Sequence, residues 1–257
     1  MNLAKKLFVG GNWKCNNTLK ETKSILESVV AKLKFNHEKV DVAIFPSTIH
    51  LSEVLHSNTN KHVIVGAQNY SHLGFGAFTG ETSFKHLQDF GITWTLIGHS
   101  ERRSLFGECN ATIAKKTKHA LENKFNVVLC VGETLAEREG NQTMDVIKTQ
   151  LNEVDKELTN KSVWTDIVIA YEPVWAIGTG KVATPDQAQA VHQFIRKWLS
   201  DLLNNEKSNA TRIIYGGSVT EKNCKELIEQ PDIDGFLVGG ASLKPAYIDI
   251  VAEADKA

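Results

Sequence analysis

Residues 167–183 run Ile167-Val168-Ile169-Ala170-Tyr171-Glu172-Pro173-Val174-Trp175-Ala176-Ile177-Gly178-Thr179-Gly180-Lys181-Val182-Ala183. The apolar start is typical of a strand that is buried in a parallel sheet. Glu172 falls where that strand must end, because Pro173 has no N–H to donate to a central ladder. Gly178 and Gly180 follow in a tip of small residues that can adopt positive φ. The stretch is compatible with a catalytic base beside a closing lid. Taken alone, however, it favours a solvated acid in an ordinary strand-to-helix loop, since most acids at strand ends are only solvated.

Strand-length apolar runs recur along the rest of the chain. They cover residues 7–9, 40–45, 62–67, 94–97, 127–131, 213–215 and 235–238. Helical periodicity lies between most of them, and helix starts are predicted by three capping boxes and two further signals, at Thr18/Glu21, Thr134/Glu137, Thr184/Gln187, Thr220 and Pro245. Eight such units predict an α/β fold, a single (β/α)8 TIM barrel, with residues 1–257 as one domain. A doubly wound sheet is the alternative, but residues 10–14 (Gly-Gly-Asn-Trp-Lys) lack its glycine fingerprint.

Composition excludes several classes of protein. The net charge of −1 gives no electrostatic reason to expect nucleic acid or an anionic membrane as a partner. No apolar stretch approaches the roughly 20 residues that span a bilayer, and the first residues lack a signal peptide, so we expect a soluble, cytoplasmic protein. The four cysteines, Cys15, Cys109, Cys130 and Cys224, form no ligand-like cluster. They are predicted to be free thiols, with no metal site.

Polar residues and glycines gather where the predicted strands end. In order along the chain they are Asn12, Lys14, His99, Ser100, Glu101, Glu172, Gly216, Gly217, Ser218, Gly239 and Gly240. In a barrel of this kind, chemistry collects at the carboxyl ends of the strands. The two glycine pairs follow the last two strands, where barrels commonly bind phosphate near helix N-termini. We therefore expect a phosphate site there, although either pair alone would suit a tight turn.

The side-chain types narrow the chemistry. His99 precedes a predicted helical turn, which favours a neutral imidazole that can donate a hydrogen bond to a carbonyl oxygen. Lys14 is expected to act electrostatically and to pair with Glu101, while Arg102 and Arg103 are expected to form structural ion pairs. A core histidine and a solvated lysine are the alternative interpretations. With no metal-ligand set, Schiff-base lysine or nucleophile elbow, the pattern favours cofactor-free proton transfer on a small phosphorylated carbonyl compound.

Five segments resemble the motifs of the triosephosphate isomerase family, in order and across nearly the whole chain. They are residues 11–14 (Gly-Asn-Trp-Lys), 98–103 (Gly-His-Ser-Glu-Arg-Arg), 170–180, 215–218 (Tyr-Gly-Gly-Ser) and 235–242. The resemblance implies interconversion of dihydroxyacetone phosphate and D-glyceraldehyde 3-phosphate through an enediolate, in glycolysis and gluconeogenesis, with no cofactor. Another phosphosugar isomerase or epimerase barrel, or a catalytically silent barrel used as a binding protein, remains as an alternative.

The resemblance also implies roles for individual residues. Glu172 would be the base, His99 the electrophile, and Asn12 and Lys14 would hold the substrate, with Ser100 and Glu101 in support. Phosphate would be bound by Asn12, Lys14, Gly178, Ser218, Gly239 and Gly240. The lid would comprise Pro173, Val174, Trp175, Ala176, Ile177, Gly178, Thr179, Gly180, Lys181, Val182 and Ala183.

A homodimer is implied as well. The loop of residues 68–80 would reach into the partner near Lys14, with Cys15, Thr79 and Gly80 at the interface. No nucleic acid, membrane or metal is expected as a partner. That assembly would explain why residues 68–82, which show no helical pattern, form a long projecting loop.

Overall fold

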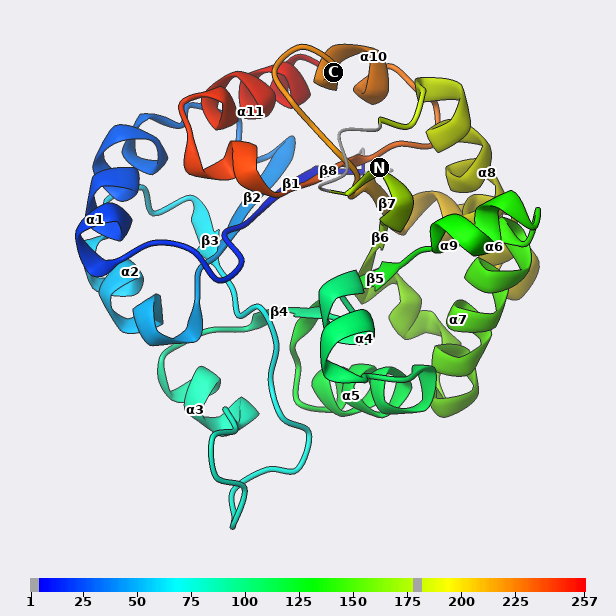
Figure 1. Cartoon of the computed structure of the whole chain (residues 1–257), viewed down its shortest axis with the longest axis horizontal. Coiled ribbons are helices and arrows are strands. Elements are labelled where there is room, and N and C mark those ends of the chain that lie inside the picture. The colour runs from blue at the N-terminus through cyan, green and yellow to red at the C-terminus, as the bar shows by residue number, and fades with distance from the viewer. Residues whose placement is uncertain (1–4, 178–181) are drawn as a thin grey trace.

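The computed structural model describes residues 5–177 and 182–257, and its strands form a ring surrounded by helices (Figure 1). The strands are β1 (Leu7–Asn12), β2 (Val40–Phe45), β3 (Val63–Val65), β4 (Trp94–Ile97), β5 (Asn126–Val131), β6 (Ile167–Tyr171), β7 (Arg212–Tyr215) and β8 (Gly235–Val238). Within the described residues all paired strands are parallel, in the order β3-β2-β1-β8-β7-β6-β5-β4. Because β1 pairs with both β2 and β8, the first strand is interior to the sheet, and the predicted (β/α)8 barrel is confirmed.

Helices cover the outside of the ring. The α-helices are α1 (Leu19–Ser28), α2 (Leu51–Ser57), α3 (Phe84–Asp89), α4 (Ser100–Phe106), α5 (Asn110–Glu122), α6 (Leu135–Glu139), α7 (Thr143–Glu157), α8 (Pro185–Leu202), α9 (Asn205–Ala210), α10 (Cys224–Ile228) and α11 (Ala246–Lys256). Short 3₁₀ turns span Val30–Lys32, Thr48–His50, Lys161–Asp166, Val174–Ala176 and Gly240–Leu243. None of the described helices is both long and apolar enough to cross a bilayer.

The ring closes between β3 and β4. Within the described residues, closure runs through a bridge between Ala67 and Thr95, just beyond the end of β3. Ala67 N–H donates to Trp94 O at 2.8 Å, and Ala67 O accepts the Leu96 N–H at 2.9 Å. The contact that closes the barrel between β3 and β4 is therefore made by Ala67, in the connection after β3.

Alternation along the strands divides the core into two layers. Successive side chains of a strand point to opposite faces, so Phe8 and Val9 on β1 fall in different buried clusters. The smaller cluster draws on alternate strand positions around the ring and comprises Phe8, Ala43, Phe45, Trp94, Leu96, Val128, Cys130, Val168, Ala170, Ile214 and Leu237. The larger cluster joins the other strand face to the helices, which fixes each strand end relative to the helix that follows it.

Most of the predicted helix starts are confirmed. Capping boxes form at Thr18, Thr134 and Thr184, each with its hydroxyl accepting the N–H three residues on. The expected cap at Thr220 is wrong, because α10 begins only after Asn223, which makes no side-chain cap. Instead, Asn223 Oδ1 accepts the Thr220 N–H at 2.8 Å and closes a separate turn before the helix.

The predicted loop of residues 68–82 projects from the barrel at the bottom of Figure 1. Its root is anchored to α5 by two residues. Asn69 Oδ1 accepts from Lys116 Nζ at 3.0 Å, and the Tyr70 hydroxyl donates to Lys116 O at 2.5 Å. The tip is exposed and carries Phe75 and Phe78.

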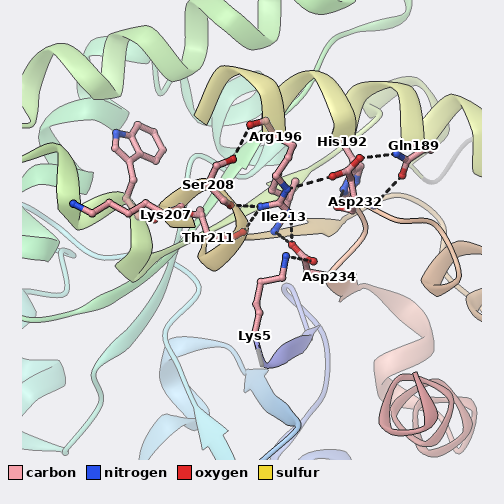
Figure 2. Close-up of polar contacts among 11 residues, drawn as sticks. Lys5, Gln189, His192, Arg196, Lys207, Ser208, Thr211, Ile213, Asp232 and Asp234 are labelled. Atoms are coloured by element: carbon pink, nitrogen blue, oxygen red, sulfur yellow. Dashed lines mark hydrogen bonds and ion pairs between the residues drawn. The ribbon is translucent and has the colours of Figure 1, made fainter. Parts of the chain in front are cut away.

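A polar network joins α8, α9, β7 and β8 at the end of the barrel where the strands begin (Figure 2). Arg196 lies at its centre, and its guanidinium donates to Asp232 Oδ1 at 3.3 Å and Asp234 Oδ2 at 2.6 Å. It also donates to the carbonyl oxygens of Ser208 and Thr211, both at 2.5 Å. One largely buried side chain on α8 thereby connects the starts of β7 and β8.

Candidate active site

Glu172 lies directly after β6, at the carboxyl end of the barrel. Its N–H donates to Val131 O at 2.7 Å, which extends the β5–β6 ladder by one residue. Its side chain is 2% exposed. Oε1 lies 2.9 Å from His99 Nε2, and Oε2 accepts the Ser100 N–H at 2.8 Å. The structure therefore brings Glu172 together with His99 and Ser100 from the end of β4.

Electrostatics keep the Glu172 carboxylate ionised. Burial raises its pKa, but His99, the Ser100 N–H and Lys14 act in the opposite direction and hold the pKa below the ordinary value of 4.5. The buried carboxylate is held by two donors, His99 Nε2 and the Ser100 N–H. It can accept a proton at neutral pH.

His99 is held from both sides of its ring. Nδ1 accepts the Glu101 N–H at 3.2 Å, which places the ring proton on Nε2, facing Glu172. Burial lowers the pKa of the imidazole, but the neighbouring Glu172 carboxylate raises it by more, so the pKa lies above 6.5 in this arrangement. Among the influences on this pKa other than Glu172, burial is the largest, and burial favours the expected neutral imidazole.

Lys14 and Asn12 occupy the end of β1. The predicted pairing of Lys14 with Glu101 is confirmed, with Nζ at 2.5 Å from Oε1. Lys14 has a φ of 52°, an uncommon conformation for a residue with a side chain, and Asn12 Oδ1 accepts its N–H at 3.0 Å. Gln68 Nε2 donates to Lys14 O at 2.8 Å. The backbone is thus fixed so that the ammonium group lies beside Glu101 and His99.

Of the two predicted arginine ion pairs, one forms as expected. Arg102 Nε lies 2.8 Å from Glu108 Oε1. Arg103 instead donates to the carbonyl oxygens of Gly98 and Cys130, at 2.7 and 3.0 Å. It therefore ties the ends of β4 and β5 together through the main chain.

Steric constraints, in addition to the expected phosphate binding, explain why glycines follow β7. A Cβ at Gly216 would lie 3.0 Å from Glu172 Cγ, and one at Gly217 would lie 2.2 Å from the Tyr215 hydroxyl. These positions therefore leave room for the protein's own side chains. Ser218 follows, half-buried, and its carbonyl accepts from Asn223 Nδ2 at 2.9 Å.

The pair after β8 begins a short helical turn, as expected of an anion site. Gly239 precedes the turn Gly240–Leu243, and Gly240 is exposed with open space where a Cβ would be. A Cβ at Gly239 would lie 3.6 Å from Cε of Lys14. The β8 turn and the Lys14 side chain are therefore neighbours.

The predicted lid is described only in part. Pro173 precedes the 3₁₀ turn Val174–Ala176, Ile177 follows it, and Ala183 is buried beside the exposed Val182. The expected positions Gly178, Thr179, Gly180 and Lys181 lie outside the described residues.

Glu133 is a site-adjacent residue that the sequence reasoning missed. It is fully buried at the end of β5, and its Oε1 accepts from the Tyr171 hydroxyl at 3.1 Å and from Trp175 Nε1 at 2.9 Å. Arg138 Nη1 lies 3.2 Å from the same oxygen. The signal was available, since Glu133 follows an apolar strand just as Glu172 does.

A cavity of about 330 Å³ connects the site with the root of the projecting loop. Its lining includes Asn12, Lys14, His99, Cys15 and Gly80. Cys15, Thr79 and Gly80 are exposed in the single chain. Over residues 5–177 and 182–257, no three metal-ligating side chains cluster as a metal site.

Comparison with known proteins gives full-length matches. A family profile described as "Triosephosphate isomerase" matches residues 7–254. Triosephosphate isomerase of Emericella nidulans is 52% identical over 97% of this chain and 98% of its own. The protein named "Triosephosphate isomerase, cytosolic" of Oryza sativa subsp. japonica is 49% identical over 98% of both chains. Nothing in the matched family or in these relatives supports either alternative function.

Proposed function

The chain belongs to the triosephosphate isomerase family, and from that premise we propose which residues interconvert dihydroxyacetone phosphate and D-glyceraldehyde 3-phosphate. The observation that carries the assignment is the contact of Glu172 with His99 Nε2 and the Ser100 N–H. Glu172 is the base. Ionised and desolvated, it removes a proton from one carbon of the bound triose phosphate and returns it to the neighbouring carbon.

His99 is the electrophile. When Glu172 leaves it for the substrate, its Nε2–H is free to donate a hydrogen bond to the carbonyl oxygen and to stabilise the enediolate. Lys14 supplies positive charge next to that oxyanion, and Asn12 orients the substrate while fixing the Lys14 backbone. Ser100 and Glu101 support the arrangement, through the Glu172 carboxylate and the Lys14 ammonium group respectively.

Phosphate binding is assigned to Ser218, Gly239, Gly240 and Gly178, together with Lys14 and Asn12. The support is the open space at Gly240 and the closeness of Gly239 to Lys14. Residues 173–183 form the lid, since an enediol phosphate that is exposed to water can expel its phosphate and the site must exclude solvent during turnover. No cofactor takes part in this scheme.

The assembly that we propose is a homodimer. Exposed apolar side chains gather on the projecting loop (Leu73, Phe75 and Phe78) and near the cavity (Ile49 and Phe106). Such surfaces mark interaction sites. The projecting loop would reach into a second subunit near Lys14, with Thr79 and Gly80 of the loop and Cys15 at the interface.

We further propose that the protein works as one barrel domain in the cytosol. The location follows the name of the rice relative, and neither nucleic acid nor membrane is needed for the reaction. The substrate is the small phosphorylated triose alone.

The assignment of the base is tested by Glu172→Gln, measured with glyceraldehyde 3-phosphate and a dehydrogenase that consumes dihydroxyacetone phosphate. The amide keeps the shape but cannot take a proton, so kcat should fall about 10²- to 10⁴-fold. Glu226→Gln, an exposed change on α10, serves as the matched control and should retain parental activity. Near-parental turnover by the Glu172 variant would reject the assignment.

A further inference from the structure

We propose that Gln150, on α7, is a positioning residue for Glu172, an inference that rests on the role of Glu172 as the base. Gln150 does not touch Glu172. It holds Gly132, and Gly132 is the residue against which the main chain of Glu172 packs.

The first link is a pair of hydrogen bonds between the Gln150 carboxamide and the main-chain N–H and C=O of one residue, Gly132. Gln150 Oε1 accepts the Gly132 N–H at 2.9 Å, and Gln150 Nε2 donates to Gly132 O at 2.9 Å. The side chain is about 9% exposed. Since β5 ends at Val131, Gly132 has passed the last ladder position, and its partly buried backbone groups need other partners. The carboxamide of Gln150 takes the place of a neighbouring strand.

The second link is the close approach of Gly132 to Glu172. A Cβ built on Gly132 would lie 1.8 Å from Glu172 O and 3.3 Å from Glu172 Cβ. The residues on either side make matching contacts, because Val131 O accepts the Glu172 N–H at 2.7 Å and Glu133 O accepts the Val174 N–H at 3.2 Å. Residues 131–133 thus form the main-chain surface against which residues 172–174 pack and hydrogen-bond.

The consequence for catalysis follows from geometry. If Gly132 loses both bonds from Gln150, its N–H and C=O must find other partners or the residue must shift, and Glu172, which packs against it, shifts as well. A displacement of about 1 Å at a reacting group can cost about 10²-fold in rate. Because the phosphate-binding turns follow β7 and β8, Gln150 should affect the chemical step far more than phosphate affinity.

The chain supplies a matched control at the opposite end of the barrel. Gln189 on α8 holds Asp232 with its own carboxamide, donating to Oδ2 at 2.7 Å and accepting the Asp232 N–H at 3.2 Å (Figure 2). Both glutamines therefore make two hydrogen bonds to one residue. Asp232 precedes β8, whereas Glu172 follows β6, so only Gln150 is connected to the site.

The experiment compares Gln150→Met with Gln189→Met in the full-length enzyme. We expect Gln150→Met to lower kcat about tenfold to a hundredfold with KM changed less than about threefold. The inhibition constant of inorganic phosphate should stay near the parental value, and Gln189→Met should keep parental kcat. Parental kcat in folded Gln150→Met, or an equal loss in both variants, would overturn the proposal.

A second variant decides the matter if Gln150→Met does not fold. Gln150→Glu keeps the size and the acceptor for the Gly132 N–H, but an ionised carboxylate faces Gly132 O with no proton to donate. Its kcat, relative to parent, should be low at neutral pH and recover as the pH falls and the carboxyl group protonates. A profile identical to the parental one would overturn the proposal.

The outcomes also separate this inference from the assignment of the base. An inactive Glu172→Gln together with fully active Gln150 variants rejects only the role of Gln150. A fully active Glu172→Gln rejects the base itself, and the positioning role falls with it.

Discussion

His99 Nε2 and Glu172 Oε1 lie 2.9 Å apart and join the ends of β4 and β6, two strands that are separated by β5 in the sheet. Each residue shifts the other's pKa, upward for His99 and downward for Glu172, against the effect of burial. The pair therefore keeps the base ionised before substrate arrives.

The first prediction concerns the acid limb of the pH profile. Glu172 is active when deprotonated, so activity should fall as pH decreases through its pKa, with a midpoint below 4.5 in the free enzyme. In His99→Gln the main opposing influence is lost while burial remains, so the midpoint of the kcat/KM limb should rise as kcat falls. His37→Gln, an exposed histidine, is the control. An unchanged midpoint in His99→Gln would show that the pair does not set this pKa.

The second prediction concerns assembly. A bulky thiol reagent on Cys15 should block the cavity that receives the partner's loop, and sedimentation or light scattering should report the mass of one chain. Cys109 is also exposed, and hydrogen bonding with Thr112 lowers its pKa, so the same reagent should modify it as well. Cys15→Ser therefore serves as the control, expected to be labelled at Cys109 and to keep its mass. A dimer that survives verified modification of Cys15 contradicts the proposed interface.

The third prediction concerns stability at the strand-start end of the barrel. Arg196→Met leaves the buried Asp234 without its guanidinium partner, although Lys5 still lies 2.6 Å from it. Removing one partner of a buried ion pair costs about 3–5 kcal/mol of unfolding free energy.

The neighbouring lysine provides the comparison. Lys197→Met removes a surface pair with Asp201 and should cost about 0–1 kcal/mol. Denaturant unfolding at one fixed protein concentration measures both variants. If both variants lost the same unfolding free energy, the network of Figure 2 would contribute no more to stability than a surface ion pair.

The fourth prediction concerns His192, whose pKa complete burial lowers to about 4. An unfolded histidine titrates near 6.5, so the folded state binds fewer protons than the unfolded state between these values. Stability contributed by the neutral ring is therefore fully present above about pH 6.5 and is lost as the pH falls toward 4, by at most ~1.4 kcal/mol per pH unit.

The test is the urea midpoint from pH 7 to pH 4.5 in the parent and in His192→Asn. The amide can still donate to Asp232 O, which accepts from His192 Nδ1 at 3.1 Å. We expect the variant to lose less stability over this range than the parent. His62→Asn should follow the parent, and parallel curves for all three proteins would rule out His192 as a source of acid sensitivity.

The sequence predicted the features that depend on local pattern. Strands, capping boxes and the order of polar residues at strand ends follow from apolar runs, and these placed Asn12, His99 and Glu172 at one end of the barrel. The cap at Thr220 failed because a nearby amide, Asn223, closed a competing turn.

The remaining features depend on contacts between distant elements. Gln150 belongs to the buried face of α7 with Ile147, Leu151 and Val154, and a polar residue among these was the available signal. Its partner Gly132 could not be read from spacing. Likewise, position 216 is glycine because a larger residue would crowd the Glu172 side chain. The two residues become neighbours only in the folded barrel.

The closure of the barrel at Ala67 makes the stability of the fold depend on protein concentration. The residue that links β3 to β4 is followed at once by the loop that we assign to the dimer contact. Seating that loop in a second chain would restrain the last link of the ring from outside. Binding of a partner stabilises the folded state by mass action. The contact between Ala67 and β4 should therefore open less often as protein concentration rises, so that closure of each barrel would depend on the second chain.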